Sequence, residues 1–177
     1  MYLSRRIIMH KFCNPNICNN MRPEIKTAKS LLQRQMTIST AESCTGGLLA
    51  HRLTNVPGSS GFFIGGLTVY ANSTKVTFLK IPPKTIAQYG AVSEPVARLM
   101  AQGIRRSFKT DIGIGITGIA GPSGGSKLKP VGTVFIAIST KNTTLSQKFL
   151  FKGSRLQNKQ QATTAALNLL LGKILKP

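Results

Sequence analysis

Short apolar segments that suit buried strands alternate with amphipathic segments along this chain, and no other feature restricts its fold as strongly. In the amphipathic segments, apolar side chains recur at helical spacing, as at Ile25, Ala28 and Leu31. Strands separated by helices favour parallel pairing, because parallel neighbours need a crossover connection. We therefore predict an α/β fold: a three-layer α/β/α sandwich with a mixed, mostly parallel sheet.

The bounds of the elements follow from the apolar pattern and from the glycines, prolines and capping residues between them. We expect strands at 36–41, 62–71, 111–118, 131–140 and 143–151. We expect helices within 21–36, 46–56, 72–81, 93–108 and 156–175. Asn72 or Ser73 is the expected N-cap of one helix, and Ser93 that of the next. The last two strands should form a hairpin across Lys141 and Asn142.

Length and charge limit the domain count and the class of partner. A chain of 177 residues with 41% hydrophobic content can bury one core, so we expect one domain at 21–177. We interpret residues 1–20 as an extension, either disordered or omitted by a start at Met21. The 24 basic and four acidic side chains give a net charge of +20, which favours anionic ligands. Scattered basic residues, 6% aromatics and no Trp argue against nucleic acid as the partner.

Acidic residues and histidines are too few for several kinds of catalytic site. The acids are Glu24, Glu42, Glu94 and Asp111, and only His51 lies inside the predicted domain. A two-metal carboxylate site or a glycosidase acid pair is therefore disfavoured. His51 lies roughly 12 Å along a predicted helix from Ser43 at the standard rise, so it is poorly placed to act as the base of that serine.

The three cysteines form no even disulfide framework, and the chain shows neither a signal h-region nor a run of transmembrane length. We therefore expect a reduced, cytoplasmic protein without a membrane partner. His10, Cys13 and Cys18 lack a fourth ligand at finger-like spacing, so we predict no metal site.

Two glycine-rich motifs do not match nucleotide-binding patterns. Gly113, Gly115 and Gly118 spell G-x-G-x-x-G, but the first two lie inside a predicted strand and no acid follows to hold a ribose. The later segment GIAGPSGGSK lacks the order of a Walker loop. The loop from Thr117 to Pro130 is left as either a plain surface connection or a ligand contact.

The segment AESCTGGLLAHRL places Ser43 in a turn between a strand and a helix. Free backbone N–H groups near such a turn can hold an oxyanion or a phosphate, and Gly46 and Gly47 leave the backbone accessible. The segment alone favours a serine or threonine that only caps the helix. Cys44 is a rival nucleophile at the same place, and Glu42 either holds a substrate hydroxyl or braces the turn.

Tyr70 and Lys75 follow the second predicted strand. The carboxyl ends of parallel strands share one edge of a sheet, so both residues would lie near Ser43. A lysine can act as the base of a serine only when neutral, which requires its pKa to fall by roughly 3 from about 10.4. Burial and neighbouring cations both act in that direction. Ser43, Tyr70 and Lys75 could thus form a hydrolytic set without histidine.

Three long segments closely resemble the CinA C-terminal-domain family, from about residue 21 to the end of the chain. They are TAESCTGGLLAHRLTNVPGSSGFFIGGLTVYANSTK, GAVSEPVA and TGIAGPSGGSKLKPVGTV. Enzymatic members of this family are nicotinamide-nucleotide amidases (NMN deamidases). The resemblance implies deamidation of nicotinamide mononucleotide to nicotinate mononucleotide and ammonia, in pyridine-nucleotide (NAD) recycling and without a cofactor.

The resemblance also implies roles for individual residues. The catalytic Ser, Tyr and Lys of the family fall on Ser43, Tyr70 and Lys75, and an arginine after the last strand falls on Arg155. The family usually has an acid where this chain has Ser154, which affects how Arg155 is oriented. Acids are also frequent in the family at the positions of Ser73 and Thr74, and their loss should lower the pKa of the neighbouring lysine.

We therefore expect Ser43 to attack the substrate carboxamide, with Lys75 taking its proton directly or through Tyr70. Backbone N–H groups of Cys44, Thr45 and Gly46 would hold the oxyanion. Glu42, Thr117 and Arg155 are further expected substrate contacts, and we expect the protein to form a homo-oligomer. The alternative is a CinA-like protein without catalytic activity that uses its basic surface to bind nucleic acid or an acidic partner.

Overall fold

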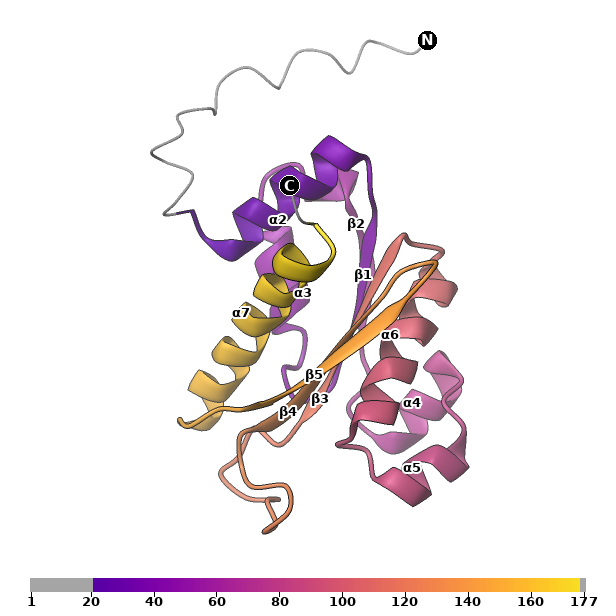
Figure 1. Ribbon diagram of the computed structural model, residues 1–177, viewed down its shortest axis with the longest axis vertical. Coiled ribbons are helices and arrows are strands. Elements are labelled where there is room, and N and C mark those ends of the chain that lie inside the picture. Colours follow the sequence, from indigo (N-terminus) through magenta and orange to yellow (C-terminus); the bar gives the residue numbers. More distant parts are fainter. Residues whose placement is uncertain (1–20, 176–177) are drawn as a thin grey trace.

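A computed structural model describes residues 21–175, in which five strands form one mixed sheet in the order β2-β1-β3-β4-β5 (Figure 1). Strand β1 pairs in parallel with both β2 and β3, whereas β4 is antiparallel to β3 and to β5. Four of the five described strands therefore point the same way, as predicted. Their bounds are β1 Ile38–Glu42, β2 Phe63–Thr68, β3 Ile112–Gly118, β4 Thr133–Ser139 and β5 Thr144–Leu150.

Helices cover both faces of the sheet, so the predicted three-layer α/β/α sandwich is confirmed. One layer contains α2, α3 and α7, and the other contains α4, α5 and α6 (Figure 1). Their bounds are α2 Pro23–Arg34, α3 Leu48–Thr54, α4 Asn72–Leu79, α5 Pro83–Tyr89, α6 Glu94–Phe108 and α7 Arg155–Lys173. A short 3₁₀ turn, η1 at Ser59–Gly61, precedes β2. Among the described residues, none of these helices is long and apolar enough to cross a membrane.

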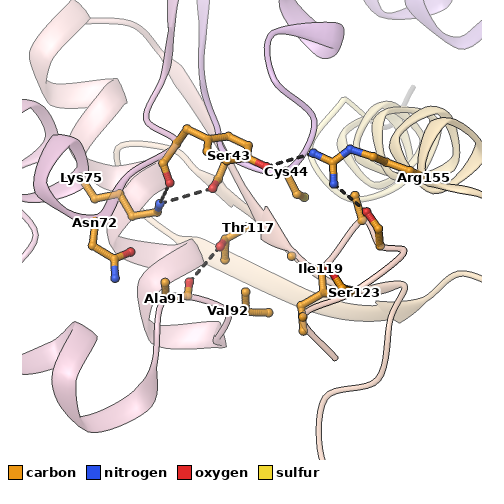
Figure 2. A pocket seen from close by; sticks show the side chains of 15 residues that line it. Ser43, Cys44, Asn72, Lys75, Ala91, Val92, Thr117, Ile119, Ser123 and Arg155 are labelled. Carbon is orange, nitrogen blue, oxygen red and sulfur yellow. Dashed lines mark hydrogen bonds between the residues drawn. The ribbon is translucent and has the colours of Figure 1, made fainter. Parts of the chain in front are cut away.

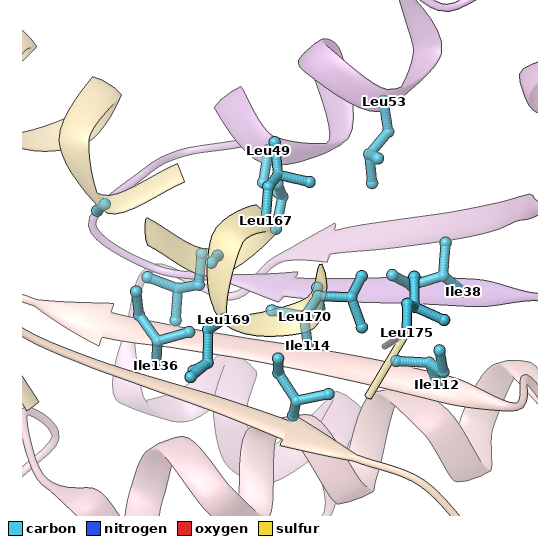
Figure 3. Packing of buried hydrophobic residues seen from close by; sticks show 14 of the residues in the cluster. Ile38, Leu49, Leu53, Ile112, Ile114, Ile136, Leu167, Leu169, Leu170 and Leu175 are labelled. Atoms are coloured by element: carbon cyan, nitrogen blue, oxygen red, sulfur yellow. The ribbon is translucent and has the colours of Figure 1, made fainter. Parts of the chain in front are cut away.

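The larger core lies between the sheet and the layer of α2, α3 and α7. Figure 3 shows strand residues such as Ile38 and Ile114 facing the helix residues Leu49, Leu167 and Leu170. All five of these side chains are fully buried. Burial of a large aliphatic side chain contributes roughly 1.5–3 kcal/mol, so this face fixes β1 and β3 relative to α7. A second cluster on the opposite face packs α4 and α6 against the sheet.

The two glycines inside β3 allow close packing with α6. A Cβ atom at Gly113 would meet the carbonyl oxygen of Ala101, and one at Gly115 would meet that of Ala97. Their function is therefore to let the α6 backbone approach the strand, as glycine does wherever backbones come close. This explains why the G-x-G pattern occurs without a dinucleotide site.

Several local expectations were wrong in detail. Ala71, and not Asn72 or Ser73, is the N-cap of α4, and α5 was not predicted at all. Ser93 is the N-cap of α6, but its hydroxyl donates to the carbonyl of Gly90 and does not cap the helix. The hairpin across Lys141 and Asn142 is confirmed by the antiparallel pairing of β4 and β5. The predictions for residues 1–20, including the assessment of His10, Cys13 and Cys18 as metal ligands, lie outside the described residues.

Candidate active site

A pocket of about 270 Å³ lies at the carboxyl ends of the parallel strands β1 and β3 (Figure 2). This is the edge where open α/β sheets usually bind ligands. The turn after β1, the beginning of α4, the loop after β3 and the first residue of α7 all contribute to its wall. The lining residues are Ser43, Cys44, Tyr70, Asn72, Lys75, Ala91, Val92, Thr117, Gly118, Ile119, Ala120, Gly121, Ser123, Gly124 and Arg155.

Ser43 and Lys75 are in direct contact at the inner end of this pocket. The Nζ atom of Lys75 lies 3.3 Å from the Oγ atom of Ser43, as the dashed line in Figure 2 marks. Lys75 lies on the buried face of α4, together with Leu79, and its side chain is only 1% exposed. The helix thus carries the amine inward to the turn that follows β1.

The amine of Lys75 has two further partners, the carbonyl oxygens of Val69 at 2.9 Å and Tyr70 at 3.0 Å. A neutral amine has two N–H groups and one lone pair. If the two N–H groups donate to these carbonyls, the lone pair is left facing the hydroxyl of Ser43. The contacts therefore suit a lysine that accepts a proton from the serine.

Burial lowers the pKa of Lys75, because removal from water disfavours its charged form. A charged Cys44 would act in the opposite direction. Cys44 itself stays protonated at neutral pH, since burial raises the pKa of its thiol to about 12. Within residues 21–175, no carboxylate forms an ion pair with Lys75. The direction of the pKa change is the one predicted from the sequence.

The same protonation of Cys44 argues against this residue as the nucleophile. Only the thiolate attacks readily, and a buried thiol with a raised pKa is inert at neutral pH. The side chain is 6% exposed and lines the pocket beside Ser43. Cys44 therefore contributes to the wall of the pocket, and Ser43 is the better-placed nucleophile.

Tyr70 lies at the outer rim of the pocket, two residues beyond the end of β2, with 59% of its surface exposed. Its hydroxyl accepts a hydrogen bond from Nη2 of Arg155 at 3.0 Å. Its backbone carbonyl is the group that contacts Lys75. Ser43 and Lys75 are joined by a direct hydrogen bond, whereas the described contacts include no hydrogen bond from the Tyr70 hydroxyl to either residue. The contacts therefore support direct transfer of the proton from Ser43 to Lys75.

Arg155 is fixed by its two hydrogen bonds and by the start of α7. In addition to Tyr70, it donates through Nη1 to the carbonyl of Gly121 at 2.7 Å. Ser154 caps the helix: its hydroxyl accepts from the N–H of Gln157, whose side chain accepts from the N–H of Ser154. This reciprocal capping box begins the helix without an acid. Arg155 is thus oriented toward the pocket even though Ser154 replaces the usual acidic residue.

Glu42 braces the turn that carries Ser43. Its carboxylate is 1% exposed and accepts hydrogen bonds from the N–H groups of Gly47, Leu49 and Ala50 at 2.8–3.1 Å. These are the N–H groups at the beginning of α3, which would otherwise lack partners. Of the two roles considered for Glu42, the described contacts support the structural one.

The N–H groups of the turn differ in their availability to a ligand. That of Gly46 donates to the carbonyl of Ser43 at 3.1 Å, so it is already engaged. Those of Cys44 and Thr45 have no hydrogen-bond partner in the part of the chain that the structure describes. The side chain of Thr45 is fully buried and does not line the pocket. Cys44 lines the pocket and Thr45 does not, so an oxyanion site is best supported at the backbone of Cys44.

Thr117 lines the pocket at the end of β3, and its hydroxyl donates to the carbonyl of Ala91 at 2.8 Å (Figure 2). This bond ties β3 to the segment that precedes α6. The loop from Thr117 to Pro130 was one of two alternatives in the sequence, a surface connection or a ligand contact, and its residues, Ser123 among them, line the pocket. Asn72 also lines the pocket, but the sequence indicated it only as a helix cap.

Comparisons with known proteins identify the family of this chain. The family described as CinA C-terminal domain matches residues 21–174. A CinA-like protein of Gemmatimonas aurantiaca is 50% identical over 137 residues, which cover 77% of this chain and 32% of that protein. The solved structure of a competence damage-inducible protein A from Klebsiella pneumoniae is similar with a TM-score of 0.84 and 32% identity, over 86% of this chain and 94% of that one.

A CinA superfamily protein from Escherichia coli has a TM-score of 0.82 at 30% identity and covers 95% of this chain and 98% of its own. This chain spans only about a third of the length of the first curated relatives it matches. The family match nevertheless covers every described helix and strand. The chain therefore belongs to the CinA C-terminal domain family.

Proposed function

We propose that this protein is an amidase that hydrolyses nicotinamide mononucleotide to nicotinate mononucleotide and ammonia. The observation that carries the proposal is the contact of 3.3 Å between Ser43 and a buried lysine whose remaining partners are two carbonyl oxygens. The substrate follows from the resemblance to the amidases of this family and suits a strongly basic chain, since the nucleotide carries a phosphate.

In the first step, the hydroxyl oxygen of Ser43 bonds to the carboxamide carbon while its proton passes to neutral Lys75. The carbonyl double bond becomes a single bond to an oxyanion. The free N–H group of Cys44 lies in the turn after β1, beside Ser43, and is the proposed donor to that oxyanion. Because it belongs to a braced turn, it need not reorganise during the reaction.

In the second step, protonated Lys75 gives its proton to the substrate nitrogen, the carbon–nitrogen bond breaks, and ammonia leaves. The oxyanion collapses to an ester of Ser43. A water molecule then gives a proton to Lys75 and adds to the ester carbon, and the lysine returns that proton to Ser43 as nicotinate mononucleotide is released. Lys75 begins and ends neutral, so its lowered pKa serves every step.

The outer rim supplies the binding groups in this proposal. Arg155 presents a guanidinium beside Tyr70 at the mouth of the pocket and is the proposed partner of the substrate phosphate. The carboxamide would then extend inward to Ser43. This arrangement separates the group that binds the anion from the neutral lysine that performs the chemistry.

Incubation of the protein with nicotinamide mononucleotide, with ammonia and nicotinate mononucleotide measured together, tests the proposal. We expect equal amounts of both products, at a rate that Ser43→Ala lowers by about 1,000-fold or more. Cys44→Ala should keep activity within about threefold, because its thiol is protonated. Undiminished ammonia release by Ser43→Ala, or its loss in a folded Cys44→Ala variant, would contradict the assignment of the nucleophile.

A further inference from the structure

Most polar groups of the pocket already have partners within the protein. The Tyr70 hydroxyl is bound by Arg155, and the Thr117 hydroxyl donates to Ala91. The loop carbonyls are engaged as well: those of Ile119, Ala120 and Gly121 accept from Gly132, Asn158 and Arg155 respectively. The polar side chains of the pocket that have no partner among the described residues are therefore few, and their positions restrict how a substrate can be held.

Asn72 is one of these few groups. Its carboxamide lines the pocket and has no hydrogen-bond partner in the part of the chain that the structure describes. It is the first residue of α4, but the N-cap is Ala71, whose carbonyl is bound by Thr74. The helix therefore does not use the side chain of Asn72. In Figure 2 this side chain lies on the Lys75 side of the pocket, away from Arg155.

The position of Asn72 relative to Lys75 follows from helix geometry. Residues three apart on a helix are neighbours on its surface, with Cβ atoms roughly 5–6 Å apart. Asn72 and Lys75 have this spacing on α4, and both line the pocket. Ser123, whose hydroxyl also has no partner among the described residues, lies on the Arg155 side of the pocket (Figure 2). Of these two side chains, Asn72 is the one on the same side as the proposed proton donor.

We propose that the Oδ1 atom of Asn72 accepts a hydrogen bond from an N–H of the substrate carboxamide and holds the leaving nitrogen beside Lys75. This inference rests on the proposed amidase function and extends it to the choice of leaving group. A carboxamide nitrogen carries two N–H groups that need acceptors once they leave water. It must also lie next to Lys75, which gives it the proton that lets ammonia depart.

The role predicts a difference between an amide and an ester of the same acid. The methyl ester of nicotinate mononucleotide presents the same carbonyl to Ser43, but its leaving oxygen has no N–H to donate. Asn72→Ala should therefore lower kcat for the amide by about 100-fold and leave kcat for the ester within about threefold. Ser73→Ala, an exposed neighbour on α4 that does not line the pocket, is the matched control and should leave both rates unchanged.

Ammonia and methanol release by wild type, Asn72→Ala, Ser73→Ala and Thr117→Val test the inference. A selective loss of amide hydrolysis in Asn72→Ala supports it. Equal loss of both activities, no loss of either, or a selective amide loss in Thr117→Val alone would overturn it while the amidase function stands. A wild-type protein that hydrolyses neither compound would end the amidase proposal and, with it, this role of Asn72.

Discussion

The inner and outer walls of the pocket are held by different means. On the inner wall, Ser43 and Lys75 are 8% and 1% exposed. The backbone carbonyls of the segment between β2 and α4 hold the amine of Lys75, and the N–H of Ser43 donates to a carbonyl of β3. On the outer wall, Tyr70 is 59% exposed and is held to Arg155 by a bond between side chains. Changes to the inner wall should therefore abolish chemistry, whereas changes to the outer wall should weaken binding.

The largest expected effect comes from removing the amine. Lys75→Met keeps a long apolar side chain but has no base, so kcat/KM for nicotinamide mononucleotide should fall by about 1,000-fold or more. Lys80→Met, at the exposed C-cap of the same helix, is the control and should change the rate less than twofold. Retention of more than a tenth of wild-type activity by a folded Lys75→Met variant would mean that the inner wall does not contain the base.

A second change tests whether the inner wall depends on its brace. Glu42→Gln replaces one carboxylate oxygen by an NH₂ group, so at least one of the three backbone N–H groups loses its acceptor and the free energy of unfolding should fall by about 2–4 kcal/mol. Urea denaturation measures this loss. Glu94→Gln removes only a surface pair with Arg98 at 3.5 Å and should cost about 0.5 kcal/mol or less. A similar loss of unfolding free energy in the two variants would mean that Glu42 stabilises the fold no more than a surface carboxylate does.

The outer wall is tested through Arg155. Arg155→Met loses the bonds to Gly121 and Tyr70 together with the cation, so kcat/KM should fall by about 10–100-fold, mainly through a higher KM. Steady-state kinetics separate the two constants, and exposed Lys152→Met serves as the charge-matched control. A fall confined to kcat would instead place Arg155 in the chemical step, and the two walls would no longer differ in function.

The last prediction concerns the dependence of the rate on pH. Lys75 must be neutral to accept a proton, so below its pKa the rate should fall by about tenfold for each pH unit of acidification. The midpoint should lie below the ordinary value of a lysine, because burial lowers this pKa. Profiles of kcat/KM for wild type and Arg155→Met should share that midpoint, since the arginine acts in binding. A flat profile, or a midpoint typical of an exposed lysine, would contradict the neutral base.

The sequence predicted the layers well because they depend on patterns within single segments. Strands β1 and β3 are continuous runs of buried residues, and the apolar positions of α6 recur at helical spacing. The family match also extends over residues 21–174. The helix α5 was missed because it has only seven residues and follows two prolines, with no buried face to produce a periodic pattern. A short helix at the surface has too few buried residues to produce a recognisable apolar pattern in a single sequence.

Contacts within the site were harder to predict, since they depend on where side chains point after the chain has folded. The sequence placed Tyr70 beside Ser43 and Lys75, but its hydroxyl lies with Arg155, whose position is set by a helix far along the chain. Gly46 was an expected oxyanion donor, yet its N–H is used within the turn. Asn72 has the type of a helix cap, and only the structure shows that it lines the pocket.

The depth at which Lys75 is packed links catalysis to the energetics of folding. In the unfolded chain this amine binds a proton up to the ordinary pKa of lysine, whereas in the folded protein it releases that proton at lower pH. Between those two values folding expels one proton into the buffer, and this site favours the folded state more strongly as pH rises. The heat of folding should consequently vary with the protonation enthalpy of the buffer, a calorimetric signature that needs no substrate.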